Sequence, residues 1–162
     1  MSFDSKQLRS AFGQFATGVC IATTTSNDGK PFGMTINSFS SVSLSPALVL
    51  WSVQNDSAQT SQWLACSHYG ISVLAEDQQD ISNYFATPGD RHISAEQLQM
   101  GAENVPLISA AKAQFECRVK ERIDAGDHTI LLAEVVAMHT PRPDAAPLLF
   151  FGGKYQQLSI AD

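Results

Sequence analysis

The sequence predicts one mainly β domain over residues 1–162, an antiparallel barrel with a few short helices. Segments rich in β-branched residues recur between Asn, Asp, Gly and Pro turn signals, which is typical of antiparallel strands. Only three segments are expected to be helical, and the first of them places apolar residues at helical spacing. No GxGxxG pattern follows a predicted strand, so a Rossmann unit is not indicated. The length of 162 residues and the hydrophobic share of 44% suit a single domain with its own core.

The charge balance excludes several kinds of partner. The chain has 16% charged residues and a net charge of −6, so it offers no basic field to a nucleic-acid backbone or an anionic membrane. Arg118, Lys120 and Arg122 form the densest basic group, and their period-2 spacing indicates the solvent face of a strand. We expect neither nucleic acid nor a membrane among the partners.

The N-terminal segment and the cysteines favour a cytoplasmic setting. The start of the chain shows no basic region followed by an apolar one, so we expect no signal peptide, and no apolar run reaches membrane-spanning length. The three cysteines lack CxxC spacing, which argues against a disulfide framework and against a zinc site. The sequence therefore predicts a protein of a reducing compartment without a bound metal.

The first half of the chain is predicted to form a helix and four strands. Apolar residues fall at helical spacing over residues 5–16, with Gly18 just beyond them. The β-branched run at residues 19–25 and the segment 32–38 flank the turn signal Asn27-Asp28-Gly29, and together they predict a hairpin. Two further strands are expected over residues 40–44 and 47–53.

The second half is predicted to alternate short helices and strands. One helix is expected from Asp56-Ser57, where a capping residue opens an apolar segment, and another over residues 77–86. Residues 87–105 have the weakest pattern of the chain, and their length is typical of a functional loop. The strands are expected over residues 69–74, 113–119, 129–138, 148–151 and 155–158.

Residues 33–46, with the sequence GMTINSFSSVSLSP, combine strand-like spacing with a high density of hydroxyl groups and one amide. Buried polar groups need hydrogen-bond partners. Hydroxyls and the exposed N–H groups of a strand can meet the carbonyls and ring nitrogens of a planar heteroaromatic ligand. The alternative is an ordinary Ser/Thr-rich strand pair whose polar face lies in water, and the residues alone leave both interpretations open.

The same segment resembles the pattern GMTxNSFxSVSLxP of the flavin reductase family, the reductase components of two-component flavin-dependent monooxygenases. Three more motifs resemble this family in the expected order: residues 12–19 (FGQFATGV), Gly126-Asp127-His128, and residues 147–151 (PLLFF) followed by Tyr155. Because these motifs cover nearly the whole chain, the resemblance is specific. It implies an FMN-binding split β-barrel, a Greek-key-like antiparallel barrel with an N-terminal helix.

The resemblance implies an NAD(P)H-dependent flavin reductase. Such an enzyme transfers a hydride from NADH or NADPH to FMN or FAD and supplies the reduced flavin to a partner monooxygenase. The cofactors carry this chemistry, and the protein contributes binding and alignment. Split-barrel proteins of this kind are commonly homodimers, so the apolar segments 3–15 and 148–151 are expected to supply buried contacts between two copies.

The resemblance also implies roles for individual residues. His128 is expected at the nicotinamide and the hydride transfer, with Tyr155 on the same side. Ser57 and Thr60 match a Ser-xx-Thr pattern that contacts the flavin phosphate, at the start of a predicted helix whose positive dipole end attracts anions. Arg91 is expected near a phosphate of the flavin or of the pyridine nucleotide. The remaining expected flavin contacts are Thr35, Asn37, Ser38, Phe39 and Ser52.

Other interpretations of these residues stay open. Judged without the motifs, Ser57 is an ordinary N-cap and His128 an ordinary surface residue. One alternative function is a non-catalytic flavin- or haem-binding carrier or sensor, although no histidine or cysteine stands in a haem-ligation motif. Another is a split-barrel flavoenzyme related to the pyridoxamine-phosphate oxidases, with a different electron acceptor, against which the Gly-Asp-His motif and the motif at residues 147–151 argue.

Overall fold

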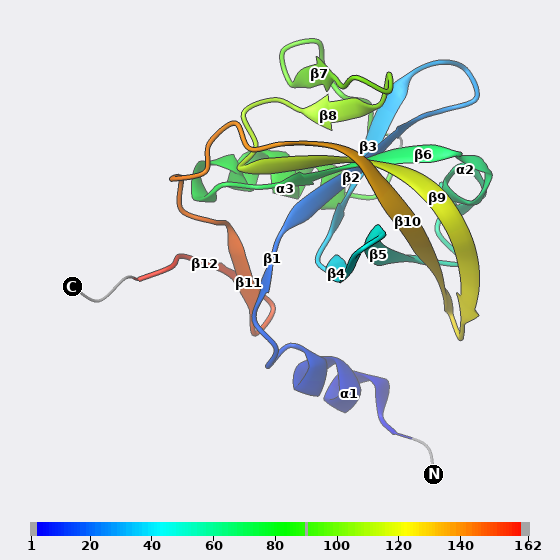
Figure 1. Cartoon of the computed structure of the whole chain (residues 1–162). Helices are drawn as coiled ribbons and strands as arrows, with labels where there is room; N and C mark the ends of the chain where they lie inside the picture. Colours follow the sequence, from blue (N-terminus) through cyan, green and yellow to red (C-terminus); the bar gives the residue numbers. More distant parts are fainter. Residues whose placement is uncertain (1–2, 90, 160–162) are drawn as a thin grey trace.

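A computed structural model describes residues 3–89 and 91–159, and it confirms the mainly β architecture (Figure 1). The helices are α1 (Ser5–Phe12), α2 (Thr60–Ala65), the 3-10 helix η1 (Glu76–Gln78) and α3 (Gln79–Ala86). The strands are β1 (Thr17–Gly18), β2 (Cys20–Thr25), β3 (Pro31–Ile36), β4 (Ser40–Leu44), β5 (Ala47–Gln54), β6 (His68–Val73), β7 (Leu98–Met100), β8 (Pro106–Ile108), β9 (Ala113–Ala125), β10 (His128–His139), β11 (Leu149–Phe151) and β12 (Lys154–Gln156). Across the described residues, no helix is long and apolar enough to cross a membrane.

Seven strands form one antiparallel sheet in the order β3-β2-β6-β9-β10-β5-β4. Figure 1 shows this sheet strongly curled, with the long β9–β10 hairpin as its central strands. Its edge strands β3 and β4 do not pair with each other within the described part of the chain, so the barrel is split open instead of closed. Two small sheets, β1-β11-β12 and β7-β8, complete the fold.

Aromatic side chains fill the inside of the curled sheet. Trp51 lies edge-on to Trp63, with ring centroids 4.9 Å apart, and edge-on to Tyr69 at 5.9 Å. The ring of Phe32 also packs against Trp63, with centroids 5.0 Å apart. All four side chains are almost completely buried, which makes this cluster the main source of hydrophobic stabilisation. A second buried cluster, between the sheet and α3, includes Ile21, Leu74, Phe85, Ile108 and Leu148.

Several predicted boundaries were wrong, mostly because the chain turns earlier or later than its apolar pattern suggests. Helix α1 ends at Phe12 instead of residue 16, since the N–H groups of Gln14 and Phe15 bond only three residues back before the chain enters β1. Helix α2 begins at Thr60 instead of Asp56-Ser57, because the N–H groups of Ser57 and Thr60 also bond three residues back. Strand β9 runs on to Ala125, and the expected loop 87–105 contains β7. Arg118, Lys120 and Arg122 are exposed on β9, as predicted.

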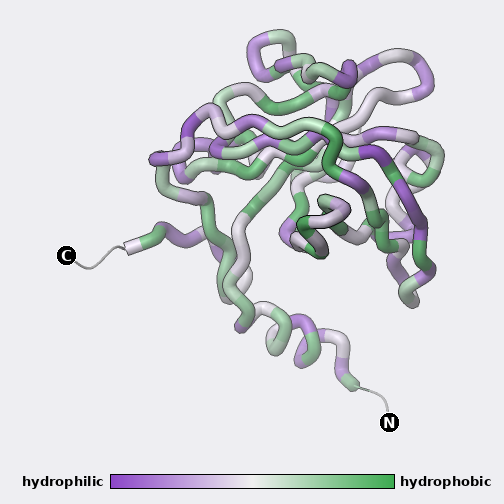
Figure 2. Tube along the Cα trace, in the orientation of Figure 1, coloured by the Kyte–Doolittle hydropathy of each residue, from purple (hydrophilic) through white to green (hydrophobic). Residues whose placement is uncertain are grey.

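Helix α1 extends away from the curled sheet (Figure 1). Asp4 caps it by accepting the N–H of Lys6 at 2.9 Å. None of its residues is buried, and the side chains of Phe12 and, just beyond the helix, Phe15 are 68% and 79% exposed. Figure 2 shows hydrophobic stretches along this helix, and no residue of the helix is buried by the part of the chain that the structure describes. The apolar side of α1 is therefore available to a partner surface.

A buried carboxylate fastens the segment between β7 and β8 to the main sheet. Glu116 on β9 is completely buried, and its two oxygens accept the N–H groups of Ala102 and Glu103 at 2.8 and 2.7 Å. Gly101 makes this approach possible, since a Cβ there would come within 2.5 Å of all three carboxyl atoms of Glu116. Charge-assisted bonds of this kind offset the cost of burying a carboxylate.

Replacing this carboxylate is expected to destabilise the fold. In Glu116→Gln, one of the two acceptor oxygens becomes an NH₂ group that faces a backbone N–H, so the free energy of unfolding should fall by about 1.5–3 kcal/mol. Urea denaturation followed by circular dichroism measures this change. The control is Glu121→Gln on the exposed part of the same strand, which should stay within about 0.5 kcal/mol of wild type. Equal stability of the two variants would contradict the assigned role of Glu116.

Candidate functional site

Two adjoining cavities form a groove along β3. They share Thr35 and Ala86 among their lining residues. The larger cavity, of about 410 Å³, lies between β3, the end of β5, the segment before α2 and the loop after α3. The smaller cavity, of about 180 Å³, lies between β3, α3 and the small sheet that contains β11 and β12. The groove therefore joins parts of the chain that are more than a hundred residues apart in the sequence.

The larger cavity has a mixed polar and apolar lining, with a single charged side chain among its described lining residues, Arg91. The guanidinium of Arg91 donates from Nε to the carbonyl of Thr87 and from Nη2 to the carbonyl of Pro88, both at 3.1 Å. It also lies 5.1 Å from the ring centre of Tyr84. Arg91 thus holds the loop after α3 in place and adds a fixed positive charge at this end of the groove.

The smaller cavity has an apolar wall and a hydrogen-bonded rim. Val19 and Phe150 line it on the apolar side. On the rim, the hydroxyl groups of Tyr155 and Ser82 lie 2.7 Å apart, and the hydroxyl of Thr35 donates to the carbonyl of Ser82 at 2.6 Å. Ser82 is completely buried on α3. Through these two hydrogen bonds it links β3 to β12 across this end of the groove.

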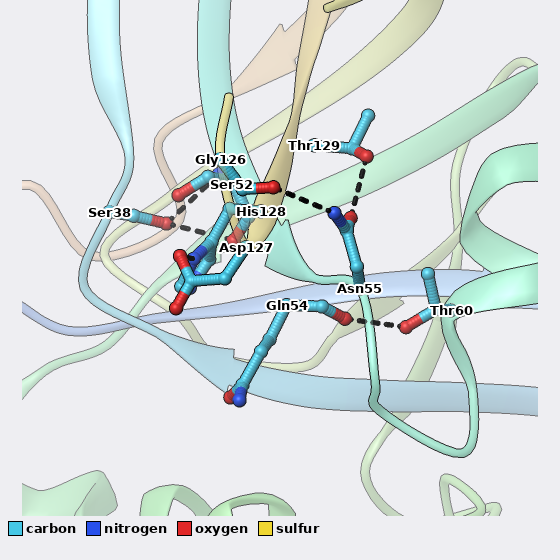
Figure 3. Close-up of polar contacts among 9 residues, drawn as sticks. All are labelled: Ser38, Ser52, Gln54, Asn55, Thr60, Gly126, Asp127, His128 and Thr129. Atoms are coloured by element: carbon cyan, nitrogen blue, oxygen red, sulfur yellow. Dashed lines mark hydrogen bonds and ion pairs between the residues drawn. The ribbon is translucent and has the colours of Figure 1, made fainter. Parts of the chain in front are cut away.

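His128 begins β10 at the tip of the long hairpin and faces the end of β5 (Figure 3). It is the register partner of Gln54, which lines the larger cavity. Paired residues of antiparallel strands point to the same side of a sheet, so the side chain of His128 lies beside the groove. Its Nδ1 lies 2.7 Å from a carboxylate oxygen of Asp127, and this contact lowers the pKa of Asp127.

The hairpin that carries His128 is tied to the segment before α2 by Asn55 (Figure 3). The backbone N–H of Asn55 donates to the carbonyl of Asp127 at 2.9 Å, and its side-chain amide donates to the carbonyl of Gly126 at 3.3 Å. The hydroxyl of Thr129 donates to the amide oxygen of Asn55 at 2.8 Å. Gly126 has φ +71°, a conformation that favours glycine in this turn. These bonds fix His128 relative to the groove.

The structure brings five of the predicted site residues to the groove itself. They are Thr35, Asn37, Ser57, Arg91 and Tyr155. Ser38 and Ser52 form a pair at its edge, where the N–H of Ser52 donates to the hydroxyl of Ser38 at 3.1 Å (Figure 3). His128 lies on β10, the strand that pairs with β5 and its Ser52. Eight predicted residues therefore lie in one region.

Phe39 and Thr60 lie behind the groove instead of lining it. The ring of Phe39 stacks on Phe115, with centroids 5.9 Å apart and an interplanar angle of 18°. Thr60 is 6% exposed, and its hydroxyl donates to the carbonyl of Gln54 at 2.6 Å. That bond fixes the turn that presents Ser57 to the larger cavity. A direct contact of either residue with a flavin stays a prediction.

Sequence reasoning missed three residues that shape the site: Asn55, Gln59 and Ser82. Ser82 follows a signal that was visible in the sequence, because it lies three residues before Phe85 on the predicted helix 77–86 and so shares its inward face. A polar residue at such a position needs a buried partner. Asn55 and Gln59 carry no comparable signal, since their partners, residues 126–129 and Gly89, are distant in the sequence.

The walls of the groove fit a ligand with a flat ring at one end and an anionic tail at the other. The smaller cavity supplies an apolar, aromatic surface next to hydroxyl groups. The larger cavity supplies hydroxyl and amide groups and one guanidinium. Ligand sites typically combine such an apolar wall with a few placed polar groups. A flavin phosphate has this chemistry.

Comparison with known proteins identifies the family. The model of the flavin reductase like domain matches residues 12–159, and the chain belongs to this family. The structure of the NADH:FAD oxidoreductase SgcE6 of Streptomyces globisporus superposes with a TM-score of 0.90 at 36% identity, covering 100% of this chain and 99% of that one. The expected split-barrel fold is confirmed by this likeness.

Two relatives with assigned roles differ in length. The FMN reductase (NADH) SmoA of Agrobacterium fabrum is 41% identical over 156 residues, which cover 96% of this chain and 87% of that protein. The reductase component of a flavin-dependent trigonelline monooxygenase from Acinetobacter baylyi is 44% identical over 130 residues. That match covers 80% of this chain but only 42% of the longer relative.

The Ser82–Tyr155 bond is expected to act as one unit in holding the groove together. Ser82→Ala and Tyr155→Phe should each lower the free energy of unfolding by about 0.5–1.5 kcal/mol. The free energy of unfolding of the double variant should fall little more than that of the less stable single variant, because each of the three variants lacks the same Ser82–Tyr155 hydrogen bond. A double-mutant cycle in urea tests this. The control Tyr84→Phe, whose hydroxyl makes only an exposed 3.4 Å bond, should leave stability unchanged, and fully additive losses would contradict the coupling.

Proposed function

We propose that this chain is an NADH- or NADPH-dependent flavin reductase that transfers a hydride to FMN or FAD. The observation that carries the proposal is the placement of His128 opposite Gln54, at the side of a groove with an apolar and a cationic end. Membership of the flavin reductase family over residues 12–159 supports it. Relatives are named as an FMN reductase and as an NADH:FAD oxidoreductase, which supports both kinds of flavin as substrate.

In this proposal the groove residues bind the flavin, and their contacts within the chain keep them in position. Thr35, Asn37, Ser38 and Ser52 line the ring and the ribityl chain, and Phe39 supports the segment from behind. Ser57 and Arg91 receive the phosphate in the larger cavity. Thr60 keeps Ser57 in position through its bond to the carbonyl of Gln54. Tyr155, held by Ser82, forms the far wall at the nicotinamide side.

A bound flavin supplies the hydride acceptor, so the chain has to provide alignment and a dry surface. Holding two rings in reactive contact is worth roughly 7–11 kcal/mol of the barrier. His128 orients the nicotinamide. Because a carboxylate only accepts hydrogen bonds, Asp127 keeps a proton on Nδ1 of His128 and leaves Nε2 free to meet the substrate.

The proposed product is reduced flavin for a partner monooxygenase. The name of the Acinetobacter baylyi relative, the reductase component of a monooxygenase, supports this role. A cytoplasmic setting is also part of the proposal. It is supported by the three cysteines, all of them free, two of which are buried so deeply that the pKa of their thiols rises to about 12.

The proposed assembly is a homodimer in which the apolar side of α1 packs on a second copy. Phe3, Leu8, Phe12 and Phe15 are all exposed in the single chain. Phe151 on β11, next to the turn bonded to Gly13, is also 41% exposed, so both apolar segments expected in a dimer lie together. Burying such side chains is worth about 1.5–3 kcal/mol each.

Substitution of His128 is expected to separate flavin binding from turnover. His128→Ala should slow NADH oxidation at saturating NADH and flavin by on the order of 10- to 100-fold, because the nicotinamide loses its orienting contact. The affinity for FMN or FAD, measured by quenching of flavin fluorescence, should stay within about twofold. NADH oxidation is followed by absorbance with FMN, FAD and riboflavin in turn.

The matched control is His68→Ala, a half-buried histidine outside the groove, which should keep the wild-type rate. Full activity of His128→Ala would remove its proposed role. If the wild-type protein bound flavin tightly and left NADH and NADPH untouched, the reductase proposal would fail in favour of a flavin carrier or sensor.

The proposed dimer is tested by introducing charged side chains into its interface. Light scattering should give the mass of two chains for the wild type at micromolar concentration. Phe12→Asp combined with Phe15→Asp should shift the protein to the monomer, because two carboxylates would have to be buried between the copies. Met138→Asp, at another exposed apolar position, should remain dimeric. A monomeric wild type would overturn this part of the proposal.

A further inference from the structure

A third cavity, of about 450 Å³, lies next to the larger cavity of the groove. It opens between the β2–β3 turn and α2, and its size is within the usual range for small-ligand sites of about 300–1,000 Å³. Its lining residues are Ser26, Asn27, Asp28, Lys30, Phe32, Gln59, Ser61, Gln62 and His92. Neither the proposed flavin site nor the proposed hydride transfer uses it.

This cavity and the larger cavity of the groove are two parts of one depression. Strand β3 contributes Phe32 to one and the adjacent Gly33 to the other, and the loop after α3 contributes His92 and Arg91 in the same way. Gln59 lines both. Its side-chain amide donates to the carbonyl of Gly89 across 3.3 Å, a long bond that forms the partition between them. A ligand that fills the larger cavity can therefore continue past Gln59.

The walls beyond Gln59 suit the second half of a dinucleotide. Lys30 brings an ammonium group, which lies 3.2 Å from the carboxylate of Asp28 and is 62% exposed. Ammonium groups bind phosphate, and a carboxylate accepts hydrogen bonds from ribose hydroxyls. The amides of Asn27 and Gln62 match the donor and acceptor pair on the edge of adenine. The imidazole of His92 offers a flat surface for stacking on a purine.

We propose that this cavity binds the adenylate half of a dinucleotide, with Lys30 at the phosphate and His92 against the adenine. The proposal rests on the proposed function, in which Ser57 and Arg91 hold a phosphate in the adjoining cavity. Both FAD and NADH carry an adenylate half that FMN and reduced nicotinamide mononucleotide lack. When an adenylate half occupies the cavity, Lys30 and His92 determine how strongly the protein prefers a dinucleotide over the corresponding mononucleotide.

Two ratios test the proposal and distinguish the two sources of adenylate: the FAD-to-FMN ratio of affinities, and the ratio of kcat/KM for NADH to that for reduced nicotinamide mononucleotide. In Lys30→Ala and His92→Ala, a cavity that holds the adenylate of FAD should weaken FAD binding about tenfold while FMN binding stays unchanged. If the cavity holds the adenylate of NADH, the FAD-to-FMN ratio should stay constant. The kcat/KM for NADH relative to that for reduced nicotinamide mononucleotide should then fall about tenfold.

The control variant is Lys120→Ala, an exposed lysine paired with Glu134 on the long hairpin, which should change neither ratio. The proposal is overturned if both ratios in Lys30→Ala and His92→Ala equal those of the wild type, or if FMN and FAD weaken equally. Direct titration of the wild type with 5′-AMP, followed by NMR, separates this outcome from failure of the proposed function. Binding of AMP that Lys30→Ala weakens supports the cavity even in a protein that does not oxidise NADH, and absence of AMP binding overturns it.

Discussion

The alternation of side chains along β5 is the constraint on which the whole site depends. Trp51 and Val53 point into the core, where Trp51 packs against Trp63 at 4.9 Å, so Ser52 and Gln54 must point the other way. A slip of one residue would bury the polar pair and expose a tryptophan, which makes the register strongly specified. Because β10 pairs with β5 in this register, His128 arrives opposite Gln54. The aromatic core thereby sets the position of a residue that it does not touch.

The strands were predictable from sequence because alternation and turn signals are local. The hairpin around residues 27–29 and the strand starting near residue 129 follow directly from such patterns. The start of α2 was not predictable in the same way, because Ser57 is a good capping residue but the segment that it opens is held in three-residue turns by contacts with the end of β5. The rim formed by Thr35, Ser82 and Tyr155 depends on tertiary contact across 120 residues, and a local pattern indicates only that Ser82 faces inward, not which residues it meets.

The polar segment 33–46 shows why the residues alone left two interpretations open, since the structure divides it between them. Thr35 and Ser38 have defined partners on α3 and β5. Ser40 and Ser41 on the edge strand β4 are exposed, as an ordinary polar strand face would be. One stretch of sequence therefore contributes both to the groove and to an exposed sheet edge.

The two tryptophans of the chain lie in a single place, packed edge to face beneath the groove. Both are fully buried, and no other tryptophan contributes from a loop or a terminus. The tryptophan fluorescence of this protein therefore comes from one point, at the contact between β5 and α2. A spectroscopist who follows that emission observes the packing directly behind the segment that carries Ser57, without attaching any label to the molecule.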